Sequence, residues 1–135
     1  MAVPSDPLFG AQWHLRNGKA GQFDLDVGAV WNPAEGTGYT GAGTRVVVVD
    51  TGIDYRHPDL KPNYDTTRDR DFMTGGSDSF GTASEAHGTA VAGLIGAARN
   101  GSGAVGVAFG AEITGYRTSP TISDTWLKEI AGAIR

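Results

Sequence analysis

The sequence contains no cysteine, no long apolar run and no excess of positive charge. Without cysteine the chain has no disulfide, no thiolate metal ligand and no thiol nucleophile. Its net charge of −4 excludes the basic surface that nucleic acids require. No apolar run reaches the roughly 18 residues of a membrane-spanning helix. We therefore expect neither a nucleic-acid partner nor a membrane partner.

Glycine, by contrast, is abundant. The 135 residues include 21 glycines, well above the average share of about 7%. Because 39% of the residues are hydrophobic and are spread along the whole chain, these glycines indicate tight turns and close backbone contacts, not disorder. The length suits one domain, so we expect residues 1–135 to belong to a single unit.

Secondary structure is predicted from the spacing of apolar residues. Four valines in a row, Val46 to Val49, predict a strand over 45–49 that is buried on both faces of a parallel sheet. Small and aliphatic residues over 89–98 favour a helix buried in a core. The other predicted elements are a short helix over 27–31, a second strand within 107–116, and an amphipathic helix carrying Trp126, Leu127, Ile130 and Ile134.

The order of these elements indicates an α/β fold with a parallel sheet and right-handed crossovers. A polar segment over 55–86 joins the first strand to its helix, and it is longer than such connections usually are. Two or three strands do not complete a sheet, and the last helix has no stop signal before Arg135. We expect this chain to be the N-terminal portion of a larger domain.

Two residues that could take part in catalysis lie at the expected carboxyl edge of this sheet. Asp50 ends the valine strand, and His87 stands at the start of the small-residue helix. The crossover rule makes strand and helix neighbours, so the carboxylate can accept a hydrogen bond from the imidazole Nδ1. Nε2 would then be free to act as a general base, as in the Ser-His-Asp arrangement.

Three other interpretations remain open from the residues alone. Asp50 could simply cap a turn after its strand. His57 could join Asp50 and His87 in a metal site, although no further carboxylate shows ligand spacing. The stretch GSGAVG (101–106) fits a dinucleotide-binding motif, but that motif follows a strand and opens a helix, whereas this one follows a helix and precedes a strand.

The motifs around the two residues resemble a known family. VVVVDTGIDYRHPDL (46–60) and HGTAVAGLIGA (87–97) are similar to the Asp and His signatures of the subtilisin-like serine peptidases, or subtilases. DPLFGAQWHLRN (6–17) and AVGVAFGAEITGYR (104–117) resemble the kexin/furin branch of that family. The chain departs from the branch at Thr51, where kexins usually carry an acid, and at Ala90.

The resemblance implies a three-layer α/β/α fold, incomplete here, and a secreted serine endopeptidase acting on polypeptides. Asp50 would orient the base, and His87 would be the base. The nucleophilic serine would lie beyond Arg135, in the missing C-terminal part of the same domain, so the fragment alone would be inactive. The alternative is a truncated, catalytically inactive subtilase that acts as a calcium-binding or interaction module.

The resemblance also implies a bound calcium ion, which takes six or more oxygen ligands. Matched position by position, the ligands would be the side chains of Asp6, Asp59 and Asn100 and the carbonyl oxygens of Ala98, Ser102 and Ala104. A second ion near Asp71 and Asp78 is a looser match.

Overall fold

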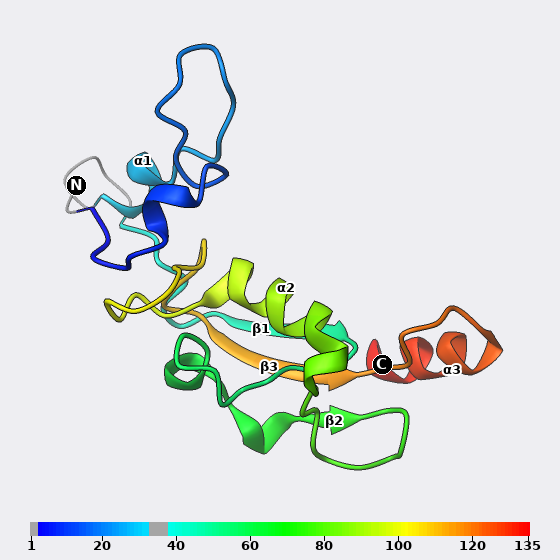
Figure 1. The fold of residues 1–135 in the computed structure, drawn as a ribbon. Helices are drawn as coiled ribbons and strands as arrows, with labels where there is room; N and C mark the ends of the chain where they lie inside the picture. The colour runs from blue at the N-terminus through cyan, green and yellow to red at the C-terminus, as the bar shows by residue number, and fades with distance from the viewer. Residues whose placement is uncertain (1–2, 33–37) are drawn as a thin grey trace.

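The structure, a computed structural model, describes residues 3–32 and 38–135 (Figure 1). Its helices and strands, in chain order, are α1 (Val27–Trp31), β1 (Arg45–Asp50), β2 (Arg70–Asp71), α2 (Ala86–Gly96), β3 (Glu112–Arg117) and α3 (Asp124–Ala133). Short 3₁₀ turns lie between them. No helix in the described ranges is both long enough and apolar enough to cross a membrane.

The three strands form one parallel sheet in the order β1-β3-β2. β1 and β3 are joined through α2, which lies along them in Figure 1, so the predicted α/β fold with a parallel sheet is confirmed. In this register Asp50 is the partner of Arg117, and both stand at the carboxyl edge. β2 was not predicted, because two residues inside a polar segment carry no apolar periodicity.

Helix α2 packs against the sheet through its smallest residues. Gly88, Ala92 and Gly96 are buried and recur every four positions, so they share one face. At Gly96 an added Cβ would lie 2.7 Å from the Cδ1 of Ile113 on β3, so glycine permits this close approach. Leu94, on another face, is 52% exposed, so the prediction of a helix buried all round is wrong.

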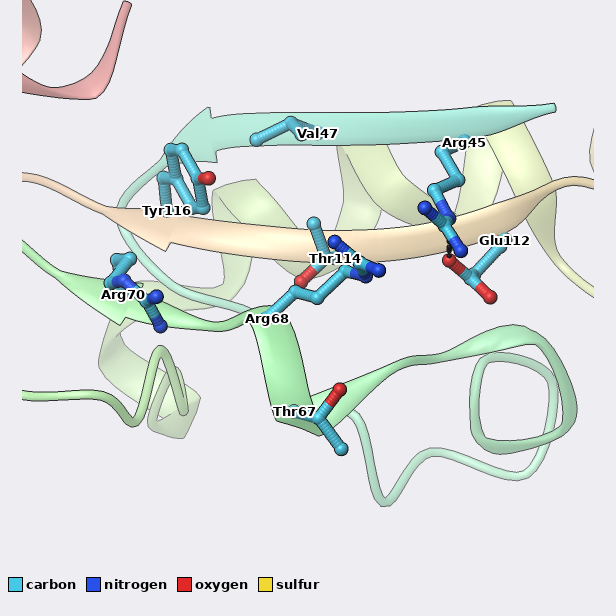
Figure 2. A pocket seen from close by; sticks show the side chains of 8 residues that line it. All are labelled: Arg45, Val47, Thr67, Arg68, Arg70, Glu112, Thr114 and Tyr116. Atoms are coloured by element: carbon cyan, nitrogen blue, oxygen red, sulfur yellow. Dashed lines mark hydrogen bonds and ion pairs between the residues drawn. The ribbon is translucent and has the colours of Figure 1, made fainter. Parts of the chain in front are cut away.

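The sheet is covered on one face only within residues 3–32 and 38–135. Val48 is buried beneath α2, whereas Val47, pointing the other way, is 45% exposed. Figure 2 shows the open face, where a cavity of about 400 Å³ is lined by Val47, Tyr116 and an ion pair between Arg45 and Glu112. The prediction of a strand buried on both faces is therefore wrong for this part of the molecule, because no second helical layer covers it.

A second apolar cluster anchors the N-terminal lead-in. Its buried members are Phe9, Leu15, Val27, Trp31 and Val105. The Trp31 Nε1 donates to the carbonyl of Val107 at 2.9 Å, which ties α1 to the segment after α2. Leu8 N likewise donates to the Gly103 carbonyl at 2.8 Å. These contacts hold the N-terminal segment against the residues that follow α2.

Candidate active site

Asp50 and His87 meet at the carboxyl edge of the sheet. The Nδ1 atom of His87 lies 2.8 Å from one carboxylate oxygen of Asp50 and 2.9 Å from the other. Since a carboxylate only accepts hydrogen bonds, we assign the proton to Nδ1. The His87 side chain is 74% exposed, whereas that of Asp50 is 15% exposed. A partly buried acid thus holds an accessible imidazole, and Nε2 is left for a substrate proton.

The environment of Asp50 keeps its carboxylate ionised. Burial by itself raises the pKa of Asp50, but hydrogen bonds from His87 and Thr51 outweigh it, and the pKa lies below its usual value. Thr51 contributes its backbone N–H at 2.6 Å and its hydroxyl at 3.1 Å from the same carboxylate oxygen. Sequence reasoning treated Thr51 only as a departure from the kexin pattern, yet it is a direct partner of the acid.

Gly88 sets the distance between the helix and the strand end. An added Cβ there would overlap the carbonyl oxygen of Gly52 and would lie 3.1 Å from the Cβ of Asp50. The helix start can approach β1 this closely only because residue 88 has no side chain. The sequence shows a glycine after His87 in HGTAVAGLIGA (87–97), but only the structure shows the steric reason for it.

An ionic cluster braces the start of α2 against the sheet. Arg117, at the end of β3, contacts Asp71 at 3.0 Å and Glu85 at 2.5 Å. Glu85 also accepts a hydrogen bond from the N–H of Thr82 in a capping box, and its carbonyl accepts one from Thr51. The hydrogen bond from Arg117 lowers the pKa of Glu85. The residue two positions before His87 is therefore tied to both β1 and β3.

The three predicted calcium-binding side chains converge on the loop over 98–104. Asp6 accepts hydrogen bonds from the N–H groups of Asn100 and Gly101 through Oδ1, at 3.1 and 3.2 Å. Asp59 accepts one from Ala104 N through Oδ2 at 2.9 Å. Asn100 donates its side-chain N–H to the carbonyl of Pro58 at 3.1 Å, next to Asp59.

Each of the two carboxylates retains one unpaired oxygen. Asp6 is 3% exposed and Asp59 is 6% exposed, and among the described residues Asp6 Oδ2 and Asp59 Oδ1 are buried without a hydrogen-bond partner. A buried carboxylate oxygen without a partner is costly, and a cation removes that cost. Gly103 leaves room beside them, because an added Cβ would collide with Asp59 Oδ2. The residues thus fit a calcium ion, with the carbonyls of Ala98, Ser102 and Ala104 in the same loop.

The other acids of the polar segment have structural partners. Asp69, which is 1% exposed, accepts hydrogen bonds from the Tyr64 hydroxyl, the Thr114 hydroxyl and Gly115 N. Asp71 accepts from Met73 N and Arg117, whereas Asp78 accepts from the Tyr55 hydroxyl and Phe80 N. Asp69 and Asp71 are therefore buried and hydrogen-bonded acids, not solvated ones. Nothing in their contacts argues for a second ion.

The competing interpretations lose support from the geometry. His57 Nδ1 accepts a hydrogen bond from Asp59 N at 3.2 Å, which makes it a turn residue. Within the described ranges, no group of three or more His, Asp or Glu side chains is placed to hold a metal, so a site formed by Asp50, His57 and His87 is not supported. The glycines over 101–106 follow α2 and precede β3, the inverse of a dinucleotide-binding loop.

A histidine held by a partly buried carboxylate at the edge of a parallel sheet is the arrangement of hydrolases that activate a hydroxyl nucleophile. The chain belongs to the subtilase family, whose sequence profile matches residues 41–135. Its relatives place it in the kexin/furin-like branch, as the resemblance predicted.

Among the relatives, neuroendocrine convertase 2 of Caenorhabditis elegans is 39% identical over 123 residues, which cover 84% of this chain and 18% of the relative. The dibasic-processing endoprotease of Schizosaccharomyces pombe is 40% identical over 114 residues, covering 84% of this chain and 16% of the relative. The serine protease of Aeromonas sobria, solved with its chaperone, superposes with a TM-score of 0.77 at 33% identity, covering 96% of this chain and 23% of that one. The chain therefore spans about a fifth of the length of such proteins.

Proposed function

We propose that the protein is a serine endopeptidase in which this chain supplies the acid and the general base. The observation that carries the proposal is the hydrogen bond between the Asp50 carboxylate and Nδ1 of an exposed His87. The nucleophilic serine and the oxyanion hole are supplied by the remainder of the domain. Residues 1–135 form the N-terminal part of that domain, and alone they have no peptidase activity.

In this proposal His87 removes the proton from the serine hydroxyl through Nε2 as the serine oxygen attacks the peptide carbonyl. Asp50 holds the ring in position and stabilises the imidazolium, which then returns the proton to the leaving amine. Ser119 lines the same pocket as His87. Its hydroxyl donates to Glu129 at 2.8 Å, so it is not presented to the base.

The substrates are polypeptides, as the family implies, and we place the protein outside the cell. Calcium-binding modules outside the cell have dissociation constants of about 10⁻⁴ to 10⁻³ M, so even a weak calcium site is occupied there. We do not expect the dibasic processing named for the S. pombe relative, because Thr51 stands where that branch usually carries an acid.

The test is to express the full reading frame that contains these residues and to measure hydrolysis of a general peptide substrate. We expect activity that a serine-directed phosphonylating reagent abolishes, and none from residues 1–135 alone. A full-length product that binds calcium but hydrolyses nothing would overturn the proposal and favour the inactive module.

We also propose that Asp6, Asp59 and Asn100 hold a calcium ion with the carbonyl oxygens of Ala98, Ser102 and Ala104. The buried, unpaired oxygens Asp6 Oδ2 and Asp59 Oδ1 support this assignment. The ion would join the N-terminal segment to the loop that follows α2. Its role would be structural, since neither Asp50 nor His87 is among these residues.

Calcium is accordingly expected to stabilise the fold. At a concentration about 100 times its dissociation constant, the ion should add about 2.7 kcal/mol to the free energy of unfolding. Thermal unfolding of the chain, followed by circular dichroism with calcium and with chelator, measures the difference. Asp59→Asn should remove most of it. The matched variant Asp78→Asn, an exposed loop acid, should keep it, and an equal loss in both variants would contradict the assignment.

A further inference from the structure

Arg117 stands at the carboxyl end of β3 and contacts two acids from different segments. Its guanidinium lies 3.0 Å from Asp71 of β2 and 2.5 Å from Glu85, the residue before α2. The exposed fractions of these side chains are only 20% for Arg117, 6% for Asp71 and 17% for Glu85. One side chain thus joins the end of β3, the strand β2 and the start of the helix that carries His87.

Stability alone is a weak reason for this arrangement. Burying charged groups costs hydration, and their attraction repays that cost only when the remaining hydrogen-bonding groups are satisfied. Within the described ranges, the Nε of Arg117 is buried without a hydrogen-bond partner. What the contacts do provide is a fixed direction, because the guanidinium is planar and its N–H groups point along set lines. The contacts of Glu85 show which atoms are held in this way.

Thr51, the residue after Asp50, connects Glu85 to the catalytic pair. The Thr51 hydroxyl oxygen lies 3.2 Å from the carbonyl oxygen of Glu85, and it accepts the N–H of Gly88 at 3.4 Å. Glu85 and Gly88 stand on either side of His87 in the sequence. The Thr51 N–H also donates to the Asp50 carboxylate at 2.6 Å. The backbone on both sides of His87 is therefore fixed to the residue that holds Asp50.

The imidazole of His87 depends on its backbone for its position. The side chain is 74% exposed, so packing does little to restrict its rotation. Its Nδ1 reaches the Asp50 carboxylate at 2.8 Å from the first turn of α2. If that turn moves, the ring loses the carboxylate that holds the proton on Nδ1. The proton is then free to occupy Nε2, the nitrogen that must stay unprotonated to act as a base.

We propose that Arg117 is a positioning residue for the general base. By holding Glu85 it fixes the first turn of α2, and it thereby keeps Nδ1 of His87 on Asp50. The inference rests on the proposed peptidase function and deepens it, because it names a residue outside the acid–base pair on which the base depends. Arg117 acts through Glu85, since its guanidinium donates to Glu85 and Asp71 and not to the pair itself.

The proton on the His87 ring is the direct readout. At alkaline pH, where imidazole is neutral, the ring ¹⁵N shifts of the 135-residue chain report which nitrogen carries the proton. The chain has three histidines, and the spectrum of His87→Gln identifies the signals of His87. We expect the proton mainly on Nδ1 in the unchanged chain. Arg117→Met keeps a long side chain but removes the charge, and it should move the proton mainly to Nε2.

A second variant and a control separate positioning from a general loss of an ion pair. Glu85→Gln preserves the capping box, but its amide has one acceptor oxygen and cannot serve both Arg117 and Thr82. The proton should shift in the same direction as in Arg117→Met. Arg45 pairs with Glu112 at 2.6 Å at the other end of β1 and β3 (Figure 2). Arg45→Met removes that pair and should leave the ring proton on Nδ1.

Activity gives a further readout. In the complete protein, Arg117→Met should lower kcat by about 10- to 100-fold with little change in KM, the scale of a misplaced catalytic group. A ring proton that stays on Nδ1 in both Arg117→Met and Glu85→Gln overturns this inference alone, and so does an equal shift in Arg45→Met. If the unchanged chain carries the proton on Nε2, the proposed base is overturned together with it.

Discussion

Replacing Asp50 by asparagine is expected to lower kcat of the proposed complete peptidase by about four orders of magnitude, the scale known for loss of this carboxylate in a serine peptidase of another fold. The asparagine amide can donate to Nδ1 of His87, which would place the ring proton on Nε2 and remove the base. The variant should remain folded, because the side chains have the same size. The measurement is kcat on a peptide substrate at neutral pH, beside a circular dichroism spectrum.

A neighbouring acid provides the control for this substitution. Asp54 lies four positions further on, and its carboxylate accepts a hydrogen bond from the N–H of Arg56 at 3.0 Å, not from His87. Asp54→Asn should change kcat by no more than a few fold. A loss of less than tenfold in Asp50→Asn would show that His87 does not depend on this acid, and the proposed role of Asp50 would have to be abandoned.

Gly88→Ala is expected to destabilise the fold by about 3 kcal/mol, because its methyl group has no space. The new carbon would overlap the carbonyl oxygen of Gly52 and press against Asp50, so either α2 or the end of β1 must move. The same movement would separate His87 from its acid. Denaturant unfolding gives the change in stability, and kcat in the complete protein should fall with it.

Gly93→Ala in the same helix is the matched control. An added Cβ at Gly93 meets nothing within 4 Å, so the substitution adds helix propensity without a collision. We expect it to stabilise the chain by about 0.5 to 1 kcal/mol. If both alanine variants changed stability alike, the close approach of α2 to β1 at Gly88 would not be the reason that glycine is needed there.

The pairing of the two candidate catalytic residues could be predicted from local patterns. An unbroken valine run predicts a strand, and a strand that ends in an acid places the acid at the carboxyl edge. A stretch of small residues after His87 predicts a helix able to pack closely. The boundaries of this helix differed from the prediction: α2 runs from Ala86 to Gly96 instead of over 89–98, and it directly follows a 3₁₀ turn, Ala83–Glu85, that begins with the capping box of Thr82 and Glu85.

The interactions that support the pair could not be predicted in this way. Arg117 contacts Glu85 across 32 positions and Asp71 across 46, and no periodicity links residues so far apart. Asp6 meets the loop at Asn100 across 94 positions for the same reason. The calcium ligands were named only through family resemblance, while the unpaired oxygens that make an ion plausible appear only when the chain is folded.

Local sequence thus sufficed for the fold class, the two main strands, the Asp50–His87 pair and the family, because each depends on a short stretch with its own conformational preference. Tertiary structure decided the rest: the partners of Asp50, the ionic contacts of Arg117 and the exposure of Val47. These features depend on which distant segments pack together, and residues apart in sequence acquire their partners only when the sheet and its loops assemble.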